Sequence, residues 1–162
     1  MNDKSVAIIV TNPDGIYSGG RYFSLMLAEG FSSLGFTTHY ITDRVPIFSN
    51  DLSAFTYHKN IKFRLGLDDN SLLSDIKVDY TFVIPGTTNK DFYDNALKCA
   101  SIMKSKIALV NFESPNWFNK YAKHKKDEKN WDGWLKIASY ANLILSISKE
   151  GNEYAKDFYK NS

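Results

Sequence analysis

Cysteine, histidine and long apolar runs are scarce in this sequence of 162 residues, and each scarcity excludes a class of protein. The single cysteine, Cys99, cannot form a disulfide within the chain, which favours a reducing compartment. The three histidines, His39, His58 and His124, lie far apart and lack the spacing of zinc ligands. No run approaches membrane-spanning length, and no signal peptide is visible. We therefore expect a cytoplasmic protein without a metal site.

Several signatures of catalysis and of nucleotide binding are also missing. The sequence contains no G-x-G-x-x-G fingerprint, no Walker A lysine and no G-x-S-x-G nucleophile elbow. Its net charge of +2 is too small to indicate nucleic-acid binding. The adjacent Asp68 and Asp69 point apart in an extended chain, so capping of a short helix around Ser71–Ile76 explains them better than a metal site.

What the sequence does contain is an alternation of strand-like and helix-like segments. Short apolar runs predict five strands buried on both faces, at Val6–Val10, His39–Thr42, Tyr80–Ile84, Ile107–Val110 and Leu143–Ile147. Ile61–Leu65 alternates apolar and basic residues, which predicts a half-exposed edge strand. Helical spacing of apolar residues predicts four helices, over Gly20–Leu34, Lys90–Met103, the segment around Trp131–Ala138 and the segment around Tyr154–Tyr159. The first ends at Gly35, the second carries Cys99 on its apolar stripe as a buried thiol, and Ser148 is the expected N-cap of the fourth. The apolar stripe of the first helix consists of Phe23, Met26, Leu27, Phe31 and Leu34.

Alternating strands and helices are typical of the α/β class with right-handed crossovers. We expect one Rossmann-like domain over residues 1–162, a three-layer sandwich around a mostly parallel sheet. In such a sheet, ligands bind outside the carboxyl ends of the strands. The loops that begin there are those near Thr11, Asp43, Pro85, Glu113 and Ser148.

The loop after the first strand ends in Ser18-Gly19-Gly20-Arg21, at the start of the first helix. Paired glycines let the backbone approach a ligand, and the N–H groups and dipole of a helix N-terminus favour a negative group such as phosphate. The alternative is a turn in which the glycines serve geometry alone. We treat these four residues as candidate ligand-binding residues.

Two segments resemble the N-terminal half of the retaining glycosyltransferases of family 4. The first is Ser18-Gly19-Gly20-Arg21, opening a helix that carries Leu27-Ala28 and is followed by Gly35. The second is Ala141-Asn142-Leu143-Ile144-Leu145-Ser146-Ile147-Ser148, which is similar to the family's "A-D-x-I-x-x-x-S" segment. Pro85-Gly86-Thr87-Thr88-Asn89 departs from the family, which often has a histidine there.

The resemblance implies the acceptor-side half of a two-domain GT-B enzyme, whose C-terminal donor domain is absent from these 162 residues. The whole enzyme would transfer a sugar, with retention and without a metal, from a nucleotide-sugar to a saccharide or lipid-linked acceptor. No cofactor besides the nucleotide-sugar co-substrate is expected. These residues alone would then be inactive, because the donor domain supplies half of the transition-state contacts.

The segment after the fifth predicted strand carries further candidates. Glu113 can position an acceptor hydroxyl as a catalytic carboxylate, while Ser114, Asn116 and Trp117 can bind a sugar by hydrogen bonds and stacking. The alternative is that Pro115 begins a helix at this point and that Trp117 packs in the core.

A basic stretch leaves two interpretations open, a solvated surface or weak peripheral contact with the inner face of an anionic membrane. Its members are Lys120, Lys123, His124, Lys125, Lys126 and Lys129. Two rival functions also remain open. One is a non-catalytic Rossmann-like module that binds a small anionic ligand, and the other is an interaction domain that docks a protein through Trp117–Trp134.

Overall fold

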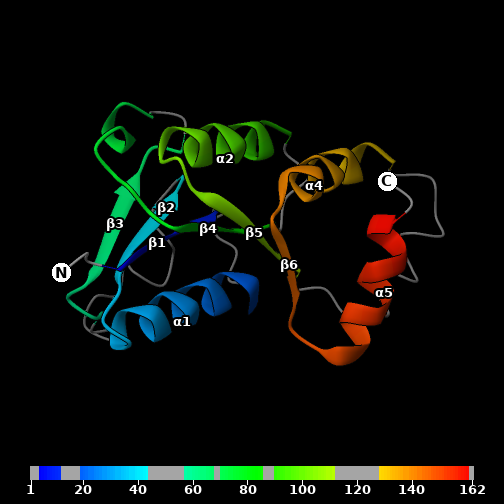
Figure 1. Ribbon diagram of the computed structural model, residues 1–162, viewed down its shortest axis with the longest axis horizontal. Coiled ribbons are helices and arrows are strands. Elements are labelled where there is room, and N and C mark those ends of the chain that lie inside the picture. Colours follow the sequence, from blue (N-terminus) through cyan, green and yellow to red (C-terminus); the bar gives the residue numbers. More distant parts are fainter. Residues whose placement is uncertain are drawn as a thin grey trace.

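Six parallel strands form a single sheet in the computed structural model, in the order β3-β2-β1-β4-β5-β6 (Figure 1). The strands are β1 (Ser5–Val10), β2 (Thr37–Thr42), β3 (Ile61–Leu65), β4 (Tyr80–Ile84), β5 (Lys106–Asn111) and β6 (Leu143–Ser146). The structure describes residues 4–11, 19–43, 57–67, 70–85, 90–111 and 128–160. All six predicted strands are present, and the predicted parallel α/β fold is confirmed.

Helices lie on both faces of this sheet, as Figure 1 shows with α1 on one side and α2 and α4 on the other. The helical elements are α1 (Gly19–Ser33), a short 3-10 helix η2 (Asn70–Leu73), α2 (Lys90–Ile102), α4 (Glu128–Tyr140) and α5 (Lys149–Lys160). Side chains alternate along each strand, so each strand contributes to two separate cores. In β1, Ile8 packs on the α1 side, while Ile9 packs on the side of α2 and α4.

Helix α1 buries only part of the predicted apolar stripe, in which Phe23, Leu27 and Phe31 pack against the core. Met26 and Leu34 belong to the predicted apolar stripe, but they are 39% and 76% exposed. Leu25 and Ala28 are fully buried instead, and the partly buried Phe31 packs against their cluster. The helix ends as predicted, because Gly35 adopts a φ of +87° and the N–H of the next residue bonds back to the carbonyl of Phe31.

On the opposite face, α2 and α4 pack against each other over the sheet. Gly133 of α4 lies against the ring of Tyr93, a buried residue of α2, so closely that a Cβ built on Gly133 would lie 2.5 Å from Cε2 of the ring. Cys99 of α2 is fully buried, which confirms the predicted buried thiol. Trp134 is also a core residue here and is therefore not available to dock a partner protein.

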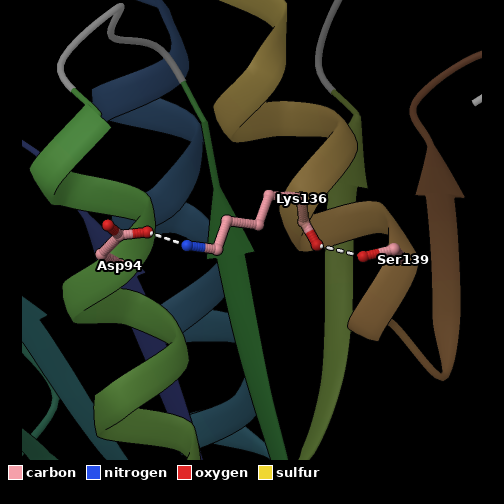
Figure 2. A network of polar contacts seen from close by, with 3 residues as sticks. All are labelled: Asp94, Lys136 and Ser139. Carbon is pink, nitrogen blue, oxygen red and sulfur yellow. Dashed lines mark hydrogen bonds and ion pairs between the residues drawn. The ribbon is translucent and has the colours of Figure 1, made fainter.

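A polar contact at the surface also connects these two helices (Figure 2). Nζ of Lys136 in α4 donates to Oδ1 of Asp94 in α2 at 2.5 Å, and the hydroxyl of Ser139 donates to the backbone carbonyl of Lys136 at 2.7 Å. Because both charged side chains are more than two-fifths exposed, solvent screening limits what the ion pair contributes to stability.

Strand β3 lies at one edge of the sheet and is mostly exposed, which confirms the predicted edge strand. Its Arg64 points toward the neighbouring strand β2, where Nε donates to Nδ1 of His39 at 3.3 Å. Burial, with smaller contributions from the charges of Arg64 and Lys62, lowers the pKa of His39 from 6.5 to about 4. His39 is therefore a neutral hydrogen-bond acceptor at physiological pH.

Strand β6, at the other edge, differs from the prediction. Leu143 and Leu145 are 45% and 37% exposed, so this strand is not buried on both faces. An edge strand has a neighbour on one side only, and its apolar character alone does not reveal whether a helix covers each face. The helix that follows starts as predicted, with the hydroxyl of Ser148 accepting a hydrogen bond from the N–H of Gly151 at 2.9 Å.

Candidate functional site

The strand order reverses direction between β1 and β4, and this reversal marks the expected ligand site. From β1 the chain proceeds outward to β2 and β3, then returns to β4 on the other side of β1. The connections on the two sides therefore diverge at the carboxyl ends of β1 and β4, which is where open α/β sheets bind ligands. Polar side chains among the described residues gather at this edge in two clusters, one on each side of the reversal.

The first cluster surrounds Asp43, which directly follows β2. Its Oδ2 accepts a hydrogen bond from the hydroxyl of Thr11 at 2.8 Å, and its Oδ1 accepts one from the hydroxyl of Thr42 at 3.2 Å. Both threonines are buried, while Asp43 is half-buried. The carboxylate is therefore held at a defined position between the ends of β1 and β2.

The first turn of α1 adds a buried positive charge to this cluster. Arg21 is only 4% exposed, although it lies just two residues after the helix begins at Gly19. Burial lowers the pKa of Arg21, whereas Tyr40, Asp43 and Tyr93 act in the opposite direction. The charge of Arg21 is therefore stabilised by residues that belong to β2, follow β2 and lie in α2.

The backbone of this turn is fixed from within the core. The hydroxyl of Ser24 donates to the carbonyl of Arg21 at 2.6 Å and lies 2.7 Å from the hydroxyl of Tyr40. Both Ser24 and Tyr40 are fully buried. These bonds hold the N-terminus of α1 against β2, with Gly19 exposed and Gly20 half-buried at the tip. The arrangement offers helix N–H groups and a cation to an anion, and a carboxylate to hydroxyl donors.

The second cluster lies at the carboxyl ends of β5 and β6. Asn111 and Ser146 are register partners across these two strands, and Nδ2 of Asn111 donates to Oγ of Ser146 at 3.3 Å. Asn111 is fully buried, and its Oδ1 has no hydrogen-bond partner among the residues that the structure describes. Since Leu109 belongs to the core beneath α2 and α4, Asn111, two positions later in the strand, faces the same side of the sheet.

Of the residues predicted from the sequence to form the site, Gly19, Gly20 and Arg21 lie at this edge. The other candidates lie outside the described residues, namely Ser18, Glu113, Ser114, Asn116 and Trp117, and so does the basic stretch from Lys120 to Lys126. Sequence reasoning placed loops at Thr11 and Asp43 but assigned neither side chain a role. A signal was available, because Thr42-Asp43 puts a hydroxyl and a carboxylate at the end of an apolar strand.

Two open cavities lined by described residues lie at the amino ends of the strands, opposite the carboxyl ends where the two polar clusters lie. One, of about 510 Å³, is bordered by Lys4, Lys77 and Lys104 at the amino ends of β1 and β4. The other, of about 430 Å³, lies at the amino ends of β5 and β6 beside Tyr140. In the part of the chain that the structure describes, no group of three His, Cys, Asp or Glu side chains could hold a metal ion. None of the described helices is both long and apolar enough to cross a bilayer.

Comparison with known proteins gives structural similarity alone. No family model matches the chain, and no curated protein matches its sequence. Phenylacrylic acid decarboxylase from Aquifex aeolicus is similar in structure, with a TM-score of 0.55 and 14% identity over 98% of this chain and 96% of that one. The chain is a Rossmann-like α/β domain. The NAD(P)-binding domain of an exopolyphosphatase-related protein from Archaeoglobus fulgidus is also similar, with a TM-score of 0.47 and 14% identity over 96% and 98% of the two chains.

These neighbours correct one interpretation of the sequence. The resemblance to family 4 glycosyltransferases is wrong, because no family model matches the chain and the similar structure with a TM-score of 0.55 is a decarboxylase. The motifs that suggested it are short. Paired glycines between a strand and a helix occur in many Rossmann-like families, because they let the backbone approach a ligand. The motif therefore does not distinguish one such family from another. The transferase activity, the donor and acceptor ligands and the missing donor domain all depended on this resemblance, and they stay untested predictions.

Proposed function

We propose that this domain binds a nucleotide at the carboxyl ends of β1 and β2, with its phosphate at the N-terminus of α1 and its ribose at Asp43. The observation that carries the proposal is the Asp43 carboxylate, which Thr11 and Thr42 hold at the end of β2 beside the reversal of strand order. In Rossmann-type dinucleotide sites, an acidic residue reached through the first βαβ unit accepts the ribose 2′-hydroxyl.

The first turn of α1 suits the phosphate. The dipole of α1 favours negative charge at its N-terminus, and the glycines at 19 and 20 let an anion come close to the backbone. The buried Arg21 adds a fixed cation in the same turn. Because the sequence lacks the tight G-x-G-x-x-G turn, we expect the phosphate to meet α1 itself after a longer loop.

Titration of the 162-residue chain with ADP-ribose by calorimetry tests this proposal. We expect binding that Asp43→Ala weakens by roughly 10- to 100-fold, as the loss of a hydrogen bond to a charged group predicts. Asp79→Asn is a matched control, because Asp79 is an exposed carboxylate at the amino edge of the sheet. Its affinity for ADP-ribose should equal that of the wild type.

A second probe tests the role of the negative charge itself. Adenosine 2′,5′-bisphosphate places a phosphate where ADP-ribose has the 2′-hydroxyl, and the Asp43 carboxylate should repel it. We expect the bisphosphate to bind more weakly than ADP-ribose. In the Asp43→Asn variant, which lacks the negative charge, the difference in affinity between the two ligands should be smaller. Failure of ADP-ribose to bind, or equal weakening by the variants at Asp43 and Asp79, would refute the proposed function.

A further inference from the structure

The buried amide of Asn111 is an unusual feature at the carboxyl ends of the strands, because one of its two polar atoms has no hydrogen bond to any described residue. Roughly nine in ten or more of the buried polar groups in native proteins have a partner. The Ser146 hydroxyl, 3.3 Å away, can either donate or accept. Whichever way the amide is turned, Ser146 therefore pairs with one polar atom, and the other has no partner in the described part of the chain.

An exclusively structural role does not account for this amide. A leucine has the same branched arrangement of heavy atoms, would continue the apolar face of β5, where Leu109 is fully buried, and would bring no polar atom of its own into the core. The asparagine lies instead at the last position of its strand, at the edge where the ligand is proposed to bind. A ligand at this position would supply the partner that the described residues do not.

The distance between the two clusters indicates the size of that molecule. Asp43 follows β2 and Asn111 ends β5, and these strands are separated by β1 and β4. Three steps between neighbouring strands span roughly 14 Å at about 4.8 Å each. A mononucleotide bound at Asp43 does not cross this width in addition to placing its phosphate at α1. A dinucleotide, which extends from one half of such a sheet to the other, does so.

We propose that Asn111 and Ser146 bind the second half of a dinucleotide, through an amide or imide group of that half. This inference rests on the proposed function, which places the adenosine half at Asp43. A planar amide carries both an N–H donor and a carbonyl acceptor, so it satisfies Asn111 in either orientation of the side chain. The site therefore distinguishes a dinucleotide with such a group from ADP-ribose, which lacks it.

A comparison of two probes tests the inference. NADH carries a carboxamide on its second half, whereas ADP-ribose carries the same adenosine diphosphate and a ribose without a base. We expect the wild-type chain to bind NADH at least tenfold more tightly than ADP-ribose. Asn111→Leu, which removes the polar atoms and keeps the branched arrangement of heavy atoms, should abolish this preference and leave the affinity for ADP-ribose within about twofold of the wild type.

Ser146→Ala provides a second variant at a half-buried position of an edge strand, where folding is less at risk. It removes the bond that orients the amide, and we expect it to reduce the NADH preference by several-fold. Circular dichroism and a thermal melt verify that each variant is folded. Asp43→Ala should weaken both probes, because both contain the adenosine half.

The outcomes separate this inference from the proposed function. If ADP-ribose binds in an Asp43-dependent manner but NADH binds no more tightly, the second contact point does not exist and the proposed function stands. The same conclusion follows if the variants at Asn111 and Ser146 keep the full NADH preference, or if they weaken both probes equally. If neither probe binds the wild-type chain, both proposals fail.

Discussion

Protonation of His39 should destabilise the fold by an amount that the structure allows one to estimate. The side chain is 9% exposed, and its pKa of about 4 lies below the ordinary value of 6.5. Between these two pH values the unfolded chain binds more protons than the folded chain, so stability rises with pH through this window and falls as the solution is acidified. At about 1.36 kcal/mol per pH unit, the loss from pH 6.5 to 4 comes to about 3 kcal/mol.

The assay is urea unfolding followed by circular dichroism, at a series of pH values from 7 to 4. His39→Asn is the reference, because its side-chain oxygen replaces the Nδ1 that accepts from Arg64 and cannot take up a proton. Carboxylates affect both proteins equally, so the difference between the two free energies isolates His39. We expect the wild type to lose about 3 kcal/mol relative to the variant, most of it by pH 4.5. Parallel pH profiles for the two proteins would refute the reasoning.

Two further predictions concern packing and surface charge. Gly133→Ala should lower the free energy of unfolding by about 1–3 kcal/mol, because the new Cβ would overlap the buried Tyr93 ring. Gly30→Ala should raise the free energy of unfolding by about 0.5–1 kcal/mol, because a Cβ at this helical position meets no atom within 4 Å. Destabilisation by both substitutions in urea unfolding would contradict this contrast. A double-mutant cycle on Asp94→Ala and Lys136→Ala should give a coupling energy of about 0.2–1 kcal/mol that decreases in 1 M salt, because both side chains are exposed. A larger coupling energy that does not change with salt would show that solvent does not screen the ion pair.

The sequence by itself determined the secondary structure and the class of fold. Strands and helices produce different spacings of apolar residues, and these spacings are local, so the runs beginning at Val6 and Tyr80 were recognisable without any contact information. Helix ends and caps are also determined by local sequence. Gly35 was therefore correctly identified as the end of one helix and Ser148 as the N-cap of another. The expected parallel order of strands also predicted that Gly19 and Arg21 lie near the carboxyl end of the first strand, as they do.

Only the tertiary structure decided which side chains meet at that edge. Thr11 and Asp43 are separated by 32 residues, and Asn111 and Ser146 by 35, so no local pattern links them. Strand order decides these pairings, and it depends on how helices pack over the whole sheet. Leu143 is exposed in the edge strand β6 although the strand is apolar. Whether other elements cover a strand depends on tertiary packing and cannot be determined from the sequence of the strand alone. Short motifs failed for the same reason. Many Rossmann-like domains need glycines in this turn for the same backbone conformation. Ligand specificity depends instead on side chains that the fold brings together from distant strands.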